Sequence, residues 1–316
     1  MGAFISLRFQ MIRRIQLIRY FLAVARSGSI RQAAEVVHLS QPALTRRIQD
    51  LESELGVMLF DRTPRGMALS RFGEVLFHHA QDIDLSCDFA LKEIQELASG
   101  DGGDLRVGAG AAWSFSLVPQ TVAKLRLTLP KVKIQFFDWV NERMMPMLID
   151  GQLDILVGGI PRLEERLPQL VYEPLFNVEQ LVFASAEHPL HGRRCTAQQL
   201  AKYPWIWFRE ARLGRSLIQQ QFDDKKIALP ESSIDTTSIH FGLQLLAQDQ
   251  LHVMLLPSTL MDAAKEFGVK PLRLKTPLEA YPAGLIYREQ AMRLKAAVAF
   301  RDLLTKQVTA VRKRFR

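Results

Sequence analysis

The stretch from Ser29 to Arg65 constrains the fold of this 316-residue chain more than any other part of it. A short segment with helical spacing, Ile30 to Val37, is followed by a tight turn and a longer helical segment, Gln41 to Leu55. Ser40 is typical of a helix N-cap, and Pro42 fits the first turn of a helix, where a missing N–H costs little. The stretch therefore predicts two helices joined by a tight turn.

The second predicted helix has two chemically distinct faces. Its apolar residues are spaced by four, three and four positions, which is the pattern of a buried helix face, and a glycine follows as a C-cap. The other face carries groups that can contact base edges, thymine methyls and phosphates in a major groove. The candidate DNA-contacting residues of the two helices are Ser29, Arg31, Ser40, Gln41, Pro42, Thr45, Arg46 and Gln49. An amphipathic hairpin with a solvated face is the alternative.

A wing is expected after this helix, over residues 57–71, because a Pro-Arg-Gly turn lies at residues 64–66. Arg62 and Arg65 flank the turn, and arginine favours the negative potential of a narrow minor groove. We therefore include both among the candidate DNA contacts. A phosphate contact without sequence information is the alternative for Arg65, and a structural ion pair is the alternative for Arg62.

This part of the chain resembles the signature of the LysR-type transcriptional regulators. The matching residues are Tyr20, Phe21, Val24, Ala25, Ser29, Ala33, Ala34, Ser40 to Thr45, Ile48, Leu51, Glu52, Leu55, Gly56, Leu59, Phe60, Arg62 and Gly73. The resemblance implies an N-terminal winged helix-turn-helix, a long linker helix, and a regulatory region of two α/β subdomains like a periplasmic binding protein. It also implies a dimer of dimers that bends promoter DNA and responds to a small-molecule effector.

The charge of the chain is concentrated at its N-terminal end. The net charge is +8, and residues 1–71 hold 11 arginines and no lysine against 5 acidic residues. A basic module is the electrostatic footprint of nucleic-acid binding, although charge alone fits a solvated basic surface equally well. We expect a DNA-binding domain over residues 1–71, with a supporting helix at 13–27 and disorder at 1–12.

One long helix is expected over residues 72–98, which contain no proline. Its apolar residues recur alternately after four and three positions, which indicates a heptad seam and a helical partner. The seam residues are Leu76, Ala80, Ile83, Cys87, Ala90, Ile94 and Leu97. We expect residues 72–99 to link the domains and to pair two chains, whereas packing against the chain's own domain is the alternative. The Gly-rich residues 99–103 form a linker by composition.

Strand and helix patterns alternate from Asp104 onward, which predicts α/β sheets covered on both faces. Strands are expected at 105–109, 132–137, 153–157, 181–184, 205–208, 233–236, 253–256 and 281–287, and helices at 114–127, 141–149, 213–222, 238–248, 258–266 and 291–311. By the family resemblance, an effector-binding domain covers residues 100–316. Its first subdomain would hold 104–176 and 281–316, and its second 177–280.

Ligands of α/β sheets gather at the carboxyl ends of strands, near helix N-termini that favour anions. Residues 110–116 and 138–141 follow the first two strands of this region, and the resemblance implies that they line the effector cleft. The candidate effector contacts are Gly110, Ala112, Trp113, Ser114, Phe115, Trp139, Asn141, Phe208, Arg209 and Thr237. Because Arg209 can pair with a carboxylate and the aromatic rings can stack, we expect a small organic acid or another anion. Helix caps and core packing are the alternative roles of these residues.

One segment departs from the family pattern. The family usually carries a Gly-rich turn before the strand that ends in Leu255-Leu256-Pro257, and this chain has Ala247-Gln248-Asp249-Gln250 instead. The departure puts the geometry of that turn in doubt. In contrast, Gly151-x-Leu153-Asp154 matches the turn that the family places before its third strand.

Other functions find little support in the sequence. Gly108-x-Gly110 starts like a dinucleotide fingerprint, but Trp113 takes the place of the third glycine. His188 and His191 lie in a Pro-containing loop with no further ligands, so no metal site is expected. The chain also has no G-x-S-x-G, P-loop or HExxH motif, so we expect no catalytic residue and no cofactor. An architectural DNA-binding protein without effector, a transport-type binding protein and a cytoplasmic enzyme are the alternatives. The absence of a long apolar run and the use of only two cysteines favour a cytoplasmic protein. The expected partners are promoter DNA, an effector, further copies of the chain and RNA polymerase.

Overall fold

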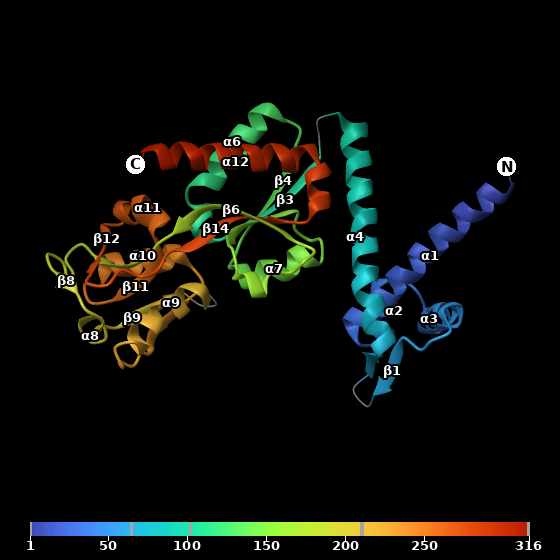
Figure 1. The fold of residues 1–316 in the computed structure, drawn as a ribbon, viewed down its shortest axis with the longest axis horizontal. Helices are drawn as coiled ribbons and strands as arrows, with labels where there is room; N and C mark the ends of the chain where they lie inside the picture. The colour runs from blue at the N-terminus through green and yellow to red at the C-terminus, as the bar shows by residue number, and fades with distance from the viewer. Residues whose placement is uncertain (1, 64–65, 101–102, 209–211, 315–316) are drawn as a thin grey trace. The chain divides into compact units, whose positions relative to one another are not determined.

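The computed structural model describes residues 2–63, 66–100, 103–208 and 212–314, and Figure 1 shows its fold. The chain divides into two compact units, residues 1–91 and 92–316. Each unit is described by itself below. Within the described residues, no helix is both long and apolar enough to span a membrane.

The first unit packs three helices and a hairpin around one core. Its elements are α1 (Gly2–Ser27), α2 (Ile30–Val36), α3 (Gln41–Leu55), β1 (Phe60–Thr63), β2 (Gly66–Leu69) and the first part of α4 (Arg71–Ser99). Phe21, Leu44 and Ile48 lie in the core, as their spacing predicts. Helix α1 begins at Gly2, upstream of the start expected at residue 13. The physical reason is that residues 3–27 contain no glycine or proline to stop the helix.

Capping fixes the two ends of α3 as the sequence predicts. The Ala43 N–H donates to Ser40 Oγ at 3.4 Å, and Gly56 ends the helix in the left-handed region with φ of 70°. The same helix also holds the start of the wing. The carboxylate of Glu52 is buried and accepts from the N–H of Leu59 at 2.8 Å and from that of Phe60 at 3.4 Å.

The wing is an antiparallel pair of strands, with Phe60 opposite Leu69 and Thr63 opposite Gly66. The N–H of Met67 donates to the carbonyl of Gly28 at 2.8 Å, which ties the wing to the turn between α1 and α2. Gly66 has φ of 126°, and a Cβ atom there would lie 2.4 Å from the Gly28 carbonyl oxygen. A side chain at this position would therefore push the wing away from that turn.

The predicted seam of α4 divides into two parts. Leu76 packs against the core of the first unit and Ala80 lies in it, so the alternative of packing within the chain's own domain holds for this end. Ile83, Ile94 and Leu97 are exposed along the rest of the helix.

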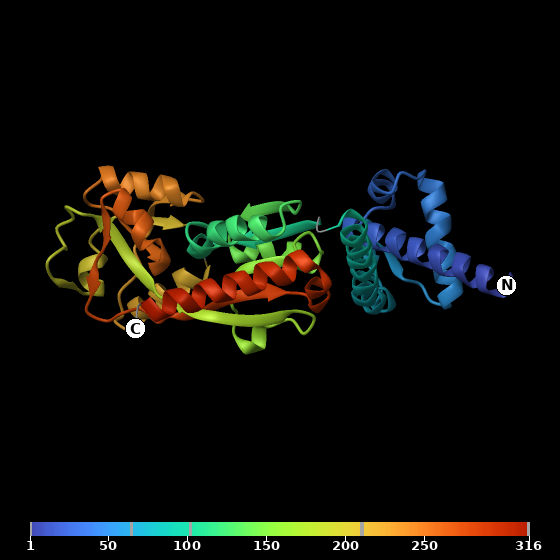
Figure 2. The same cartoon turned by 90° about the horizontal axis from the view of Figure 1, so that it is seen from above.

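Two five-stranded sheets form the second unit. The first has the order β4-β3-β5-β14-β6, in which β3 pairs in parallel with β4 and β5, and β14 runs antiparallel to β5 and β6. Its strands are β3 (Asp104–Ala109), β4 (Lys133–Asp138), β5 (Ile155–Gly159), β6 (Val171–Val178) and β14 (Tyr281–Tyr287). Its helices are α5 (Ala111–Ser114), α6 (Leu117–Thr128), α7 (Asn141–Ile149), η1 (Leu163–Glu165), η3 (Glu289–Arg293) and α12 (Lys295–Arg314). Helix α12 packs along α6, as Figure 2 shows from above.

The second sheet has the order β10-β9-β11-β7-β12. Its strands are β7 (Gln180–Ser185), β9 (Trp205–Phe208), β10 (Ser232–Thr236), β11 (Val253–Pro257) and β12 (Val269–Pro271). Its helices are α8 (Ala197–Leu200), α9 (Arg212–Asp223), α10 (Ile239–Gln248), η2 (Ser258–Leu260) and α11 (Met261–Glu266). Two short strands, β8 (Arg194–Cys195) and β13 (Arg273–Leu274), pair separately. The chain passes between the two sheets at residue 179 and again over residues 275–280.

Several elements differ from the expectation. Strand β6 was not predicted, because Pro174 and Glu173 interrupt its apolar pattern; β6 is an edge strand, where proline is tolerated. Since β6 ends at Val178, the expected boundary at 176 falls inside a strand. The helix expected at 114–127 is two helices, because Ser116 has non-helical angles, and Pro119 then lies in the first turn of α6. The last helix begins at Lys295 and not at residue 291.

Candidate functional site

The outer face of α3 presents the side chains that the sequence singles out. Gln41, Pro42, Arg46 and Gln49 are exposed. Thr45 is half-buried, and its hydroxyl donates to the Gln41 carbonyl at 2.8 Å, so its methyl is the group left for a contact outside the helix. The face therefore offers two amides, one guanidinium and apolar surface, which suit base edges in a major groove.

Some predicted DNA contacts have structural partners. Ser29 and Ser40 cap α2 and α3, because their hydroxyls accept from Gln32 N–H and Ala43 N–H. Arg31 is exposed and forms an ion pair with Glu35 at 3.7 Å. Arg65 and the side chain of Arg62 lie outside the described residues.

A second candidate site is a cleft of about 560 Å³ between the two sheets of the second unit. The lining residues include Gly110, Trp113, Val140, Asn141, Glu142, Met145, Gly158, Gly159, Glu165, Gln180, Trp207, Phe208, Arg215, Ile239, Leu255, Leu256 and Tyr281. Most of these side chains are apolar or aromatic, and charge is supplied by two glutamates and one arginine. Such a cleft fits a small molecule with an apolar body and a few polar atoms.

The predicted effector contacts are divided between this cleft and a smaller pocket. Gly110, Ala112, Trp113, Asn141 and Phe208 line the cleft. Phe115, Trp139 and Thr237 line the neighbouring pocket of about 240 Å³, which Phe208 also borders. Ser114 lies on α5 and is half-buried, and it lines neither cavity, while Arg209 lies outside the described residues.

Close packing holds the first wall of the cleft. Asn141 begins α7, and its Nδ2 donates to the carbonyl of Gly159 at 2.6 Å, which joins α7 to the end of β5. A Cβ atom on Gly158 would lie 2.0 Å from Asn141 Oδ1, so only glycine allows this approach. Trp113 is almost fully buried, and its ring lies 4.8 Å from that of Phe176.

The second wall combines stacked rings with a cation. Trp207 stacks on Trp205 with 4.7 Å between the ring centroids, and the guanidinium of Arg215 lies 5.2 Å from the Trp207 ring. Both Trp207 and Arg215 line the cleft. This wall can therefore receive an apolar group beside an anionic one.

Tyr281 adds a neutral hydroxyl to the cleft. Burial raises the pKa of Tyr281 to about 12; a hydrogen bond from Gln180 opposes this shift and the nearby Glu142 adds to it. The Gln180 Nε2 donates to the phenol oxygen at 3.2 Å. At neutral pH the phenol keeps its proton, which it can donate to a ligand.

Sequence reasoning missed Trp207, Arg215 and Tyr281. The missed signal for Tyr281 is topological, because it begins an antiparallel strand. The first residue of such a strand lies at the edge where the neighbouring parallel strand ends, and Tyr281 is thus beside the cleft. Trp207 adjoins Phe208 at the end of β9, so the rule that selected Phe208 applies to it as well.

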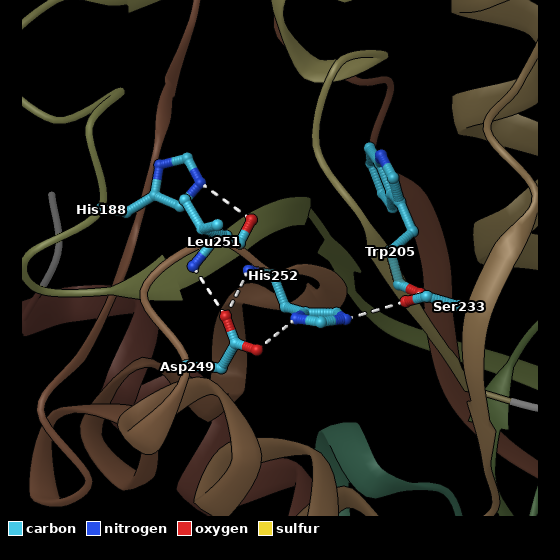
Figure 3. A network of polar contacts seen from close by, with 6 residues as sticks. All are labelled: His188, Trp205, Ser233, Asp249, Leu251 and His252. Atoms are coloured by element: carbon cyan, nitrogen blue, oxygen red, sulfur yellow. Dashed lines mark hydrogen bonds and ion pairs between the residues drawn. The ribbon is translucent and has the colours of Figure 1, made fainter.

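The turn before β11, which departs from the family pattern, is built by a side chain (Figure 3). Asp249 accepts from the N–H groups of Leu251 and His252 at 2.8 and 3.3 Å, and from His252 Nδ1 at 2.7 Å. Burial raises the pKa of the Asp249 carboxyl, but these hydrogen bonds outweigh it and hold the pKa below its ordinary value. Asp249 itself has an extended backbone, so the turn requires no glycine there.

The same turn is tied to two neighbouring segments. His252 Nε2 lies 2.9 Å from Ser233 Oγ, and that hydroxyl donates to the Trp205 carbonyl at 2.9 Å. His188 Nε2 lies 3.3 Å from the Leu251 carbonyl oxygen. The turn is thereby fixed at the end of the sheet opposite the cleft residues of β11.

Comparisons with known proteins agree with this architecture. Residues 15–74 match the family model for a bacterial regulatory helix-turn-helix protein of the lysR family, and residues 98–309 match the model for a LysR substrate binding domain. The chain is 37% identical over 191 residues to the SDS degradation transcriptional activation protein of a Pseudomonas strain, a match that covers 59% of this chain and 62% of that protein. It is 26% identical to the uncharacterized HTH-type transcriptional regulator YbhD of Escherichia coli, over 91% of this chain and 89% of that protein.

Solved structures show the same fold. A full-length OxyR variant from Pseudomonas aeruginosa matches with a TM-score of 0.62 at 21% identity, over 92% of this chain and 94% of that one. CbnR, a LysR family transcriptional regulator, in complex with its target DNA matches with a TM-score of 0.51 at 20% identity, over 93% and 99% of the two chains.

Proposed function

This chain belongs to the LysR family of transcriptional regulators, and from that membership we propose which of its residues read DNA and what kind of effector its cleft binds. The protein is a DNA-binding regulator with an effector-binding domain. We place its action in the cytoplasm, with promoter DNA and RNA polymerase as its partners.

We propose that Gln41, Arg46 and Gln49 read base edges in the major groove, while Pro42 and the Thr45 methyl contact thymine methyls. The exposed face of α3 carries this proposal. Ser29 and Ser40 would mainly set the helix ends close to the phosphates, because their hydroxyls already accept backbone N–H groups. Arg31, Arg62 and Arg65 would contact the backbone or the minor groove.

DNA selection with the purified full-length protein tests this first. Two half-sites about one helical turn apart would support a dimeric regulator. An absence of enriched sequences at low and moderate salt would contradict the proposed reading of DNA by α3.

The Arg46→Ala variant then separates base reading from phosphate contact. If Arg46 makes a bidentate base contact, affinity for the selected operator falls by about 1–3 kcal/mol, and affinity for random DNA changes little. Arg47 is a matched control, because it is an exposed arginine of the same helix that pairs with Asp50 at 3.6 Å. An equal loss on all sequences would make Arg46 a phosphate contact.

We propose that α4 pairs two copies of the chain through its exposed apolar residues, which include Ile83, Ile94 and Leu97. Leu76 and Ala80 are excluded from that seam, because they belong to the chain's own core. The resemblance to the family supports further assembly of two dimers. Sedimentation equilibrium of the Ile94→Glu, Leu97→Glu variant should show a smaller assembly than the wild type. An unchanged mass would contradict the seam.

We propose an effector that is a small organic anion with an apolar body. The apolar and aromatic lining, with Arg215 beside Trp207, is the observation that carries it. The 37% identical Pseudomonas relative, whose name concerns SDS degradation, supports an amphiphilic anion.

Titration calorimetry with octanoate and octyl sulfate below their micellar concentrations tests this proposal. Arg215→Ala should weaken binding about tenfold or more, as expected for loss of a charged partner. Arg209→Ala tests the arginine predicted from the sequence. Lys225, an exposed cation that is not among the cleft residues, is a control. Equal affinity for the neutral alcohol octanol would contradict an anionic effector.

A further inference from the structure

We propose that an ion cluster around a buried carboxylate couples the cleft to α4 through strand β5. The cluster consists of Asp154, Lys92 and Arg106, and we call it the Asp154 clamp. Through it, a structural change of the cleft on effector binding would alter how tightly α4 is held against the sheet. This inference rests on the proposed function, in which the cleft binds an effector and the DNA-binding unit reads an operator.

The Asp154 clamp satisfies a fully buried carboxylate with two cations. Asp154 has no exposed surface, and its Oδ1 lies 2.5 Å from Lys92 Nζ and 3.0 Å from an Arg106 terminal nitrogen. Its Oδ2 accepts from the Arg106 N–H at 2.8 Å. Lys92 belongs to α4, whereas Arg106 belongs to β3, so the carboxylate joins the helix to the sheet.

Strand β5 leads from the clamp to the cleft. It begins at Ile155, directly after Asp154, and ends at Gly159, and its length of five residues corresponds to about 16 Å. Its first four residues are buried, and it lies between β3 and β14 in the sheet. Gly158 and Gly159 line the cleft at its far end. Because β5 is short, buried and hydrogen-bonded on both sides, a displacement at Gly159 would be passed on to Asp154.

Strand β3 follows the same course. It runs parallel to β5, with Val107 opposite Ile155 and Ala109 opposite Val157. Arg106 lies near its start, and Gly110, which lines the cleft, follows its end. Both strands that hold the clamp therefore end at the cleft.

A second contact fixes the last turns of α4 to the same unit. The carboxylate of Glu96 accepts from the N–H of Lys295, the first residue of α12, at 3.0 Å. A carboxylate at a helix N-terminus is favourable. Residues from Lys92 onward belong to the second compact unit, whereas the earlier residues of α4 belong to the first. The clamp thus holds the helix where it enters the regulatory unit.

A double-mutant cycle on operator affinity tests the coupling without an effector. Gly158→Ala disturbs the cleft end of β5, because its Cβ would lie 2.0 Å from Asn141 Oδ1. Asn141→Ala disturbs the same end by removing the hydrogen bond to Gly159. Lys92→Met opens the clamp, and Lys131→Met is the control, since Lys131 is an exposed lysine that borders the same surface hollow as Lys92.

We expect each cleft-end variant to change the dissociation constant for the operator about 2- to 30-fold in the wild-type and Lys131→Met backgrounds. In the Lys92→Met background the change should be less than about twofold, because the clamp no longer transmits it. Lys92→Arg, which keeps the cation, should restore the response. Equal changes in every background, or no change in the wild type, would overturn the coupling.

Amide exchange of the full-length protein gives a readout that does not depend on DNA. If Asn141→Ala speeds exchange in residues 92–98 and Lys92→Met abolishes this effect, the coupling holds. It is overturned if exchange there is the same in the wild type and in Asn141→Ala. Because this result is independent of operator selection, failure of the DNA-binding proposal is distinguishable from failure of the clamp. If Gly158→Ala does not fold, Asn141→Ala alone decides the test.

Discussion

Helix α4 takes part in two ion clusters of similar size, one centred on an exposed arginine and the other on a fully buried carboxylate. In the first unit, Arg19 of α1 pairs with Asp84 at 2.6 Å and with Asp88 at 2.9 Å. In the second unit, Asp154 pairs with Lys92 and Arg106 at comparable distances. The side chain of Arg19 is 44% exposed, whereas that of Asp154 is fully buried.

The comparison teaches that the distance between two charges does not by itself give the contribution of an ion pair to stability. Arg19 and Asp88 are about half exposed, so water solvates them when a partner is lost, and such a pair contributes roughly 0–1 kcal/mol. Around Asp154, the carboxylate has no exposed surface and its two cations are only 18% and 23% exposed, so breaking this cluster costs more, about 3–5 kcal/mol. The second cluster should therefore control the stability of its unit, and the first should hardly affect it.

The largest effect is expected from Asp154→Ala, which removes three contacts at once, those to Lys92, to the Arg106 guanidinium and to the Arg106 N–H. We expect the free energy of unfolding of the second unit to fall by about 3–5 kcal/mol. Urea denaturation of the full-length protein, followed by tryptophan fluorescence, measures it, because Trp113, Trp205 and Trp207 lie in this unit. A loss below about 1 kcal/mol, the range of exposed pairs, would show that the buried cluster behaves like a surface pair.

Lys92→Met should have an intermediate effect, because Asp154 keeps Arg106 as a partner. Loss of one hydrogen bond between charged groups corresponds to about 1.5–3 kcal/mol of unfolding free energy. The same denaturation experiment applies, with Lys131→Met as the exposed control. If Lys92→Met lowers the unfolding free energy as much as Asp154→Ala does, Arg106 alone does not stabilise the buried carboxylate.

His188 sharpens the comparison, because it is a buried titratable ring whose hydrogen-bond partners are backbone groups. The Leu190 N–H donates to its Nδ1 at 3.1 Å, so Nε2 carries the proton and donates to the Leu251 carbonyl. Burial lowers the pKa of His188 below 6.5; the Leu251 carbonyl opposes this shift, and the neighbouring His191 adds to it. The folded state therefore favours the neutral ring.

This shift predicts the direction of a pH effect. Well above pH 6.5 the ring is neutral in the folded and unfolded chains, and its contribution to stability is complete. As the pH falls from 6.5 toward the lower folded value, only the unfolded chain takes up the proton, so the unfolding free energy decreases. Denaturation at about pH 7.5, 6.5 and 5.5 should show a shallower slope for His188→Asn than for the wild type. Since no ion pair is lost, we expect a smaller change than for Lys92→Met. Parallel slopes would contradict the assignment.

The smallest effect is expected from Arg19→Met, which removes the exposed cluster. The unfolding free energy of the first unit should fall by roughly 0.2–1 kcal/mol, and the difference should shrink as salt is added. Circular dichroism during urea denaturation measures it. A loss of several kcal/mol that persists at about 1 M salt would place this cluster with the buried one.

The two units also differ in how far their sequence predicts them. The ends of α3 depend on contacts between residues a few positions apart, such as the hydrogen bond from the Ala43 N–H to Ser40. A short stretch of sequence is therefore enough to predict them. The Asp154 clamp joins residues 62 and 48 positions apart. Asp154 stands out in the sequence through its family motif, but neither Lys92 nor Arg106 does, because no local pattern names a distant partner.

The cleft shows the same limit. Its predicted residues, such as Trp113 and Asn141, follow predicted strands and so obey a rule that the sequence can express. Tyr281 and Arg215 become cleft residues only because the two sheets face each other. That arrangement depends on strand order, which no local sequence pattern gives. Strand β6 was missed because its edge position, which tolerates Pro174, is a property of the sheet.

The buried carboxylate of Glu52 has a consequence for groove geometry. Because Glu52 belongs to the helix that carries Arg46 and binds the N–H groups of Leu59 and Phe60, it fixes the distance between this helix and the wing. A helix and a wing at a fixed distance fit best to DNA in which the major groove and the adjacent minor groove already have the matching separation. We therefore expect base pairs that the protein never touches, between the helix and the wing, to influence affinity through the width they give the minor groove.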